Sequence, residues 1–223
     1  MESTTETTET LPGLLDDLSW FCQGLRPLER SILLTLSYAD LFDYPLSHQE
    51  LHRYLIGNPA TPHSIQEALG SKNGFSRVVT AREGLITLAE REEIIETRRR
   101  RAGVAADFWQ GAIRYGRIIA RLPFVRMVAV TGALAMDNVD EDGDIDYLIV
   151  TEPGRLWLSR AWCILLVRIA GMVGSRICPN YFLTTRALRD LQRSLYSAHE
   201  ISQMIPISGG NCYQELRSQN RWV

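Results

Sequence analysis

The chain is predicted to have a mixed α/β (α+β) fold, with helices and short strands grouped into two domains. Residues 25–101 show apolar positions at helical spacing and then a hairpin-like segment, whereas residues 102–223 contain β-branched runs around a small-residue turn. The apolar fraction of 45% and the charged fraction of 22% are typical of a globular protein with a sizeable core. Residues 1–24 are expected to form an acidic, disordered tail.

Bulk properties exclude several classes of function. The formal net charge of −2 gives no general attraction to nucleic acid or to acidic membranes. The four cysteines show no CxxC spacing, so we expect reduced thiols in a cytoplasmic protein, and the start "MESTTETTET" lacks the features of a signal peptide. The most apolar run, "LWLSRAWCILLVRIAGMVG", carries Arg160 and Arg168, which favours a buried amphipathic helix over a membrane span. No membrane partner is expected.

Three helices are expected first in the N-terminal domain. Pro27 suits the first turn of the first helix. The second helix opens on a capping box from Ser47 to Glu50, and the third begins after Thr61 and ends at Gly70. The three segments are "PLERSILLTLSYADLF", "SHQELHRYLIG" and "TPHSIQEALG".

Two short β-rich runs follow in "FSRVVTAREGLITLAE", and Glu83 and Gly84 form the expected hairpin turn between them. Three helices followed by a two-stranded hairpin are typical of a winged helix-turn-helix domain over residues 25–101. A long helix within "EREEIIETRRRRAGVAADFWQGAIRYGRIIARL" is expected to link this domain to the next.

DNA binding is the less favoured function for such a domain here. Its third helix would read the bases, yet that helix contains Glu67 and no Arg or Lys. Duplex binding needs cations for phosphates and side chains that reach base edges. Only Lys72 and Arg77 lie close behind, and the arginines at 98–101 point all round a helix. Packing or protein interaction is therefore favoured.

The segment "TGALAMDNVDEDGDIDYLIV", residues 131–150, concentrates six acidic residues between two apolar runs. Part of it matches a calcium-binding EF-hand loop, but Ile149 stands where the bidentate Glu is needed and the flanks are β-branched. A zinc-protease helix is also disfavoured, since Gln49 rather than Glu follows His48. We interpret the segment as strand, small-residue turn, acidic loop and strand.

Asp144 and Asp146 begin the second of these strands. Because side chains alternate along a strand, the two carboxylates project from one face, with backbones about 7 Å apart. Carboxylates placed in this way can share divalent metals, and Mg²⁺ is the usual ion that bridges phosphates. Gly132 allows the backbone to approach a phosphate. The cluster is therefore predicted to be a metal–triphosphate site.

The same segment resembles the signature of the polymerase-beta-like nucleotidyltransferase superfamily: a hydrophobic strand, Gly followed by Ser or Gly, about ten residues, and Asp-hydrophobic-Asp. The surrounding strand order extends this resemblance over residues 124–184, and the whole chain resembles bacterial proteins that join a winged helix to such a domain. The resemblance implies a mixed sheet flanked by helices over residues 102–223. It also implies two Mg²⁺ ions and transfer of a nucleoside monophosphate from NTP, with release of pyrophosphate.

Carried over by position, Gly132 is the glycine that approaches phosphate, and Asp144 and Asp146 are the catalytic metal ligands. Two positions depart from the family pattern. Ala133 replaces the residue that supplies a hydroxyl, and Asn180 is the best-placed polar residue where the family has a third carboxylate. An amide carries no charge and cannot act as a general base. Glu200 is a conceivable substitute.

The resulting expectation is Mg²⁺-dependent nucleotidyl transfer to an unknown acceptor, which could be a small molecule, a nucleic acid or a protein. The alternative is a catalytically silent nucleotide-binding or regulatory protein whose winged helix binds DNA or a partner; a toxin or antitoxin of the superfamily would share the chemistry. A helix over "TRALRDLQRSLYSAHEISQM" should align Arg186, Arg189 and Arg193, a face more typical of solvent contact than of triphosphate binding.

Overall fold

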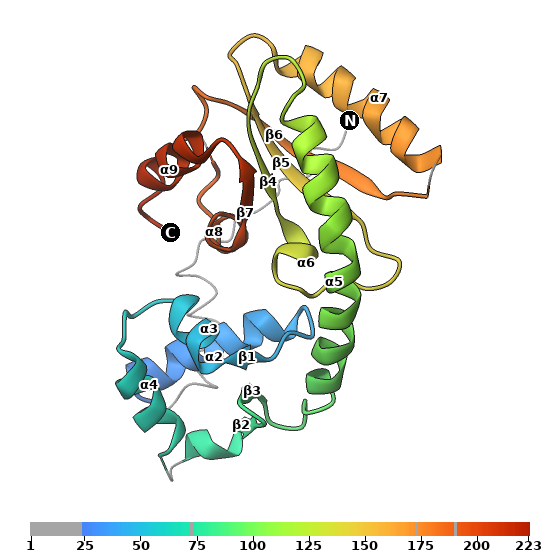
Figure 1. The fold of residues 1–223 in the computed structure, drawn as a ribbon. Coiled ribbons are helices and arrows are strands. Elements are labelled where there is room, and N and C mark those ends of the chain that lie inside the picture. The colour runs from blue at the N-terminus through green and yellow to red at the C-terminus, as the bar shows by residue number, and fades with distance from the viewer. Residues whose placement is uncertain (1–23, 72–73, 173, 190) are drawn as a thin grey trace, which may run out of the picture. The chain divides into compact units, whose positions relative to one another are not determined.

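The computed structural model describes residues 24–223 except positions 72–73, 173 and 190 (Figure 1). The expected tail over residues 1–24 and Lys72 therefore lie outside the described residues, apart from Gly24. The chain divides into two compact units, one ending at Ile95 and the other beginning at Glu96, and each is described by itself. Helices and two sheets give an α+β fold, which confirms the predicted class.

Over the described residues 24–93, apart from positions 72 and 73, the first unit contains three α-helices and a small antiparallel sheet of strand order β1-β3-β2. Its helices are α2 (Pro27–Asp40), α3 (His48–Arg53) and α4 (Pro62–Leu69), followed by the short 3-10 helix η1 (Gly74–Arg77). Its strands are β1 (Leu46–Ser47), β2 (Val79–Arg82) and β3 (Leu85–Leu88). Three helices before a hairpin reproduce the order expected of a winged helix-turn-helix.

Local sequence signals account for these elements. Pro27 occupies the first turn of α2, and the side chains of Ser47 and Glu50 cap α3 reciprocally. Glu83 and Gly84 have φ angles of 54° and 80°, which is the left-handed pair required by a tight hairpin turn. Buried apolar side chains from helices and sheet, including Ile32, Leu51, Ile65, Phe75 and Ile86, form the core of the unit.

The second unit is built on a four-stranded mixed sheet of order β6-β5-β4-β7. The strands are β4 (Val125–Val130), β5 (Ile145–Thr151), β6 (Ile177–Thr184) and β7 (Ile205–Ser208). β5 and β6 are parallel, whereas β4 is antiparallel to both β5 and β7. The two edge strands, β6 and β7, each contain a proline, Pro179 and Pro206.

Helices cover both faces of this sheet (Figure 1). They are α5 (Ile94–Ile119), the single turn α6 (Gly132–Ala135), α7 (Leu156–Met172), α8 (Leu195–Gln203) and α9 (Gly210–Gln219). Helix α5 begins two residues before the division between the units. Alternate residues of β5 enter opposite cores: Tyr147 and Ile149 pack with α5 and α7, while Leu148 and Val150 pack with α8 and α9. This arrangement follows directly from strand geometry.

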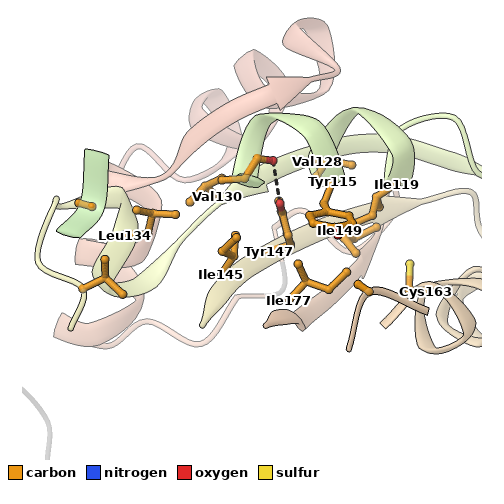
Figure 2. Packing of buried hydrophobic residues seen from close by; sticks show 14 residues of the cluster. Tyr115, Ile119, Val128, Val130, Leu134, Ile145, Tyr147, Ile149, Cys163 and Ile177 are labelled. Atoms are coloured by element: carbon orange, nitrogen blue, oxygen red, sulfur yellow. Dashed lines mark hydrogen bonds between the residues drawn. The ribbon is translucent and has the colours of Figure 1, made fainter. Parts of the chain in front are cut away.

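Tyr147 is central to the first of these cores (Figure 2). Its ring is fully buried, and its hydroxyl donates a 2.7 Å hydrogen bond to the backbone carbonyl of Ala112 in α5. A buried phenol needs such a partner. The bond therefore fixes β5, the strand that begins at the acidic pair, against the long helix.

The expected helix from residue 185 is wrong in its first half. α8 begins only at Leu195, where Ser194 caps it by accepting a hydrogen bond from the Ser197 amide. Among the described residues between 185 and 194 none is helical, because Leu188 is buried in the core beneath α9 and its carbonyl accepts from Asn220. The expected alignment of three arginines on one helix face therefore does not occur.

Helix α7 is also less buried than expected. Only its small residues Ser159, Cys163 and Ala170 are buried, whereas most of its large apolar side chains are exposed. Of the helices in the described parts of the chain, none is long and apolar enough to cross a membrane.

Candidate functional site

The site forms where β4 ends and β5 begins. β4 ends at Val130, and the amide of Thr131 donates a 3.0 Å hydrogen bond to the carbonyl of Asp146. Gly132 then opens the single turn α6. Antiparallel pairing of β4 with β5 thus sets the predicted glycine turn directly beside the predicted acidic pair.

Asp144 and Asp146 converge as the alternation along a strand predicts. A carboxylate oxygen of each, together with the Cys178 sulfur, lies within 4.8 Å of the others. Asp144 is exposed and Asp146 is half-buried. Two carboxylates and a thiol therefore lie close together at the end of the sheet where β5 begins.

Two neighbouring acidic residues, Asp140 and Asp142, pair with arginines. Asp140 forms ion pairs with Arg100 at 2.7 Å and Arg101 at 2.8 Å, and these two guanidinium groups lower the pKa of its carboxyl. Asp142 lies 3.1 Å from Arg176. The basic run in α5, which sequence reasoning treated as pointing all round the helix, thus directs two adjacent side chains to one carboxylate.

No such partner reaches the acidic pair. Among residues 24–223, outside the four undescribed positions 72, 73, 173 and 190, no Arg, Lys or His forms an ion pair with Asp144 or Asp146. Burial, and then the charge of Asp144, raise the pKa of the Asp146 carboxyl, while a hydrogen bond with Cys178 opposes that rise. The pair therefore carries uncompensated charge.

Both the backbone conformation and the space at position 132 require glycine. Its φ angle of +64° lies in the left-handed region that favours glycine. A Cβ at this position would come within 2.5 Å of the Asp146 Oδ2 atom, so any other residue would displace the carboxylate. Ala133 follows in α6, is exposed and offers no hydroxyl.

Glu200 of α8 is a third carboxylate beside the pair. The Gly132 amide and the hydroxyls of Thr131 and Tyr196 donate hydrogen bonds to it. These bonds only partly offset burial and the charge of Asp146, which raise the pKa of the Glu200 carboxyl. The sequence offered Glu200 merely as a substitute, because no local pattern shows that α8 packs over the glycine turn.

The neighbour of Asp146 on β6 is Cys178 rather than Asn180. Parallel pairing aligns Asp146 with Cys178, and an irregularity in register between Asp146 and Leu148 leaves Asn180 exposed beyond it. Burial, followed by the charges of Asp146 and Asp144, raises the pKa of the Cys178 thiol to about 11. The thiol is therefore neutral near pH 7, and a neutral thiol is a poor ligand for hard cations.

The oxygen atoms of Asp144 and Asp146 are accordingly the groups that could hold a hard divalent cation. They are close together, they bear no cationic partner in the described part of the chain, and a backbone free of a side chain lies beside them. A triphosphate brought by such a cation would meet the Gly132 region without a steric barrier from a Cβ.

No protein-family model and no curated protein matches the sequence. A solved structure, "Crystal structure of the toxin-antitoxin with AMP-PNP", is similar to part of the chain at 12% sequence identity and a TM-score of 0.29. The match covers 47% of this chain and 83% of the other. At this TM-score it carries no inference about fold or function.

Proposed function

We propose that the protein is a Mg²⁺-dependent nucleotidyltransferase that moves a nucleoside monophosphate from NTP to an acceptor and releases pyrophosphate. The observation that supports this most is the convergence of Asp144 and Asp146 beside Gly132, where no cationic side chain of the described residues pairs with them. A structural acidic cluster would be expected to have partners like those of Asp140. This pair instead suits a ligand that brings positive charge.

Asp144 and Asp146 are the residues that would hold Mg²⁺, two ions being expected when NTP is present. The ions would neutralise the triphosphate and the charge that develops as pyrophosphate leaves. Gly132 keeps the approach to Asp146 open, since a side chain there would push the carboxylate aside. Glu200 adds a third carboxylate, the charge that the exposed amide of Asn180 lacks.

The test is incubation with each NTP labelled at its α-phosphate, with Mg²⁺ and candidate acceptors, followed by detection of transferred label and pyrophosphate. Asp144→Asn and Asp146→Asn should each lower transfer by at least about 100-fold, because each removes a ligand charge. Asp142→Asn is the matched control in the same loop, where the carboxylate pairs with Arg176. It should retain transfer within about twofold.

The second candidate is a catalytically silent protein that binds nucleotide. It is favoured by the neutral thiol of Cys178 at the position next to Asp146 and by the missing hydroxyl at Ala133. Titration calorimetry with and without chelator separates the possibilities. NTP affinity that needs Mg²⁺ and Asp146, without any transferred label, would favour this candidate, whereas equal affinity in chelator would contradict both.

A further inference from the structure

Helix α7 exposes an unusual amount of apolar surface. Seven of its large apolar residues are at least 42% exposed, although such residues normally form the covered stripe of a helix. They are Trp157, Leu158, Trp162, Ile164, Leu165, Ile169 and Met172. The residues that pack against the rest of the unit are the buried Ser159, Cys163 and Ala170 and the partly buried Leu166 and Val167.

Five of the seven form a regular row. Leu158, Trp162, Leu165, Ile169 and Met172 follow one another at intervals of four, three, four and three residues. A mean spacing of 3.5 residues keeps apolar side chains on one seam and is the pattern by which two helices pack side by side. The row therefore fits a second helix better than a strand or a small ligand.

The size of the surface suits a stable dimer. If each large side chain offers about 150–250 Å², the exposed fractions of the five residues in the row correspond to roughly 400–650 Å². The largest apolar patch of a typical monomer is about 300–600 Å², and a standard interface buries about 800 Å² on each partner. The row alone thus equals the largest apolar patch of a typical monomer and supplies about half to four-fifths of one side of an interface.

The charges on α7 are compatible with pairing to itself in one orientation. The helix contains Arg160 and Arg168 and no acidic residue. In an antiparallel pair centred on Leu165, Arg168 lies across from Trp162 of the second copy rather than from another arginine. The two copies of Arg168 are then six residues, roughly 9 Å, apart along the axis, a separation that salt screens well.

We propose that α7 is a dimerisation helix, which packs antiparallel against α7 of a second copy of this chain with the two-fold axis at Leu165. A two-fold axis makes each residue on it meet its own counterpart. Leu165 is therefore the position at which a single charge would be doubled within the apolar seam.

Sedimentation equilibrium of the full chain tests the proposed dimer. Chain concentrations of about 1–100 µM resolve micromolar dissociation constants. The wild type should approach twice the chain mass of 25.3 kDa. Leu165→Glu should weaken dimerisation at least about 100-fold, since two carboxylates would be desolvated face to face. Ile164→Glu is the matched control: Ile164 is 47% exposed and Leu165 48%, but Ile164 lies outside the row.

A mixing experiment tests the position of the axis. Equal amounts of Leu165→Glu and Leu165→Lys should form a heterodimer although each alone is monomeric, because the opposite charges then meet at the axis. Melting curves check that each variant is folded. The proposal is overturned by a monomeric wild type at the highest concentration, by equal effects of the two Glu substitutions, or by a monomer that uses Leu165 to bind vesicles containing anionic lipid.

Discussion

The acidic residues between positions 137 and 146 differ in what surrounds them. Asp137 accepts a hydrogen bond from the Trp109 indole, Asp140 binds two arginines, and Asp142 lies beside Arg176. Asp144 and Asp146 lie beside each other, Cys178 and Glu200, and no Arg, Lys or His in the described part of the chain forms an ion pair with them. Residues of one chemical type, a few positions apart, thus serve as structural ion pairs in one half of the segment and as a candidate ligand site in the other.

Removing one charge from the candidate site should stabilise the protein when no ligand is present. Asp144→Asn or Asp146→Asn relieves repulsion, so the melting temperature in chelator should rise by about 1–3 °C. With saturating Mg²⁺-NTP the order should reverse. The wild type then gains ligand stabilisation that Asp144→Asn and Asp146→Asn lack, about 5–10 °C at 100 times the dissociation constant.

Differential scanning fluorimetry of wild type, both variants and Asp142→Asn, each with and without Mg²⁺-NTP, measures this reversal. Asp142→Asn should respond to ligand as the wild type does, because its carboxylate lies against Arg176 rather than in the pair. A uniform loss of stability in both site variants, unchanged by ligand, would mean that the pair caps local backbone and is structural.

Glu200 should make stability depend on pH in a defined direction. Its pKa is raised in the folded state, so the folded protein holds the proton more tightly than the unfolded chain. Stability from this group is therefore present below its ordinary pKa of about 4.3 and is lost as pH rises through the raised value. Glu200→Gln, which has no carboxyl group to ionise at this position, should not lose this stability as pH rises.

The free energy of unfolding of Glu200→Gln relative to wild type should thus increase from pH 4 to pH 7. Urea denaturation in chelator at three pH values measures the difference between the two proteins. A difference that stays constant across this range would show that only hydrogen bonds from Gly132, Thr131 and Tyr196, and not the carboxyl charge, distinguish the two side chains.

At the scale of the elements, a substitution in the turn of the β2–β3 hairpin should change stability through backbone conformation alone, without a change in side-chain packing. A Cβ at Gly84 or at Gly103 would meet nothing within 4 Å, but only Gly84 has a positive φ, +80°. Gly84→Ala should therefore cost about 1–2 kcal/mol. Gly103→Ala in α5 should contribute about 0.5–1 kcal/mol of stability. Urea denaturation of the two variants measures both effects, and equal effects of one sign would contradict this interpretation.

The elements predicted correctly from the sequence are those with local signals. The Ser47–Glu50 capping box, the proline in the first turn of α2 and the Glu83–Gly84 turn each depend on neighbouring residues alone. β7 and the true start of α8 were missed because their causes are distant: β7 is a four-residue strand stabilised by pairing with β4, and residues before Leu195 are drawn into the core by Leu188.

The residues of the candidate site also divide into those with a local sequence signal and those brought together by tertiary structure. Gly132, Asp144 and Asp146 were identified because their spacing and the alternation along a strand lie within fifteen residues of sequence. Cys178 and Glu200 join them only through the register of β6 and the packing of α8, which are tertiary features. Position along the strand favours Asn180, whereas the irregular register that follows Cys178 depends on the pairing of β6 with β5.

At the scale of the whole molecule, the first unit is predicted to bind duplex DNA no more tightly than the micromolar range of non-specific binding. Its third helix α4 contains no Arg or Lys, and several arginines of the unit are engaged by carboxylates, Arg82 by Glu92 and Arg91 by Asp40 and Asp43. Mobility-shift titrations at several salt concentrations check this. Tight binding with a steep salt dependence would contradict it.

The prolines at both edges of the four-stranded sheet have a consequence for how the chain behaves at high concentration. Pro179 in β6 and Pro206 in β7 each lack the amide hydrogen that an added strand would need. Growth of the sheet from molecule to molecule, the route to fibrils, is thereby obstructed at either end.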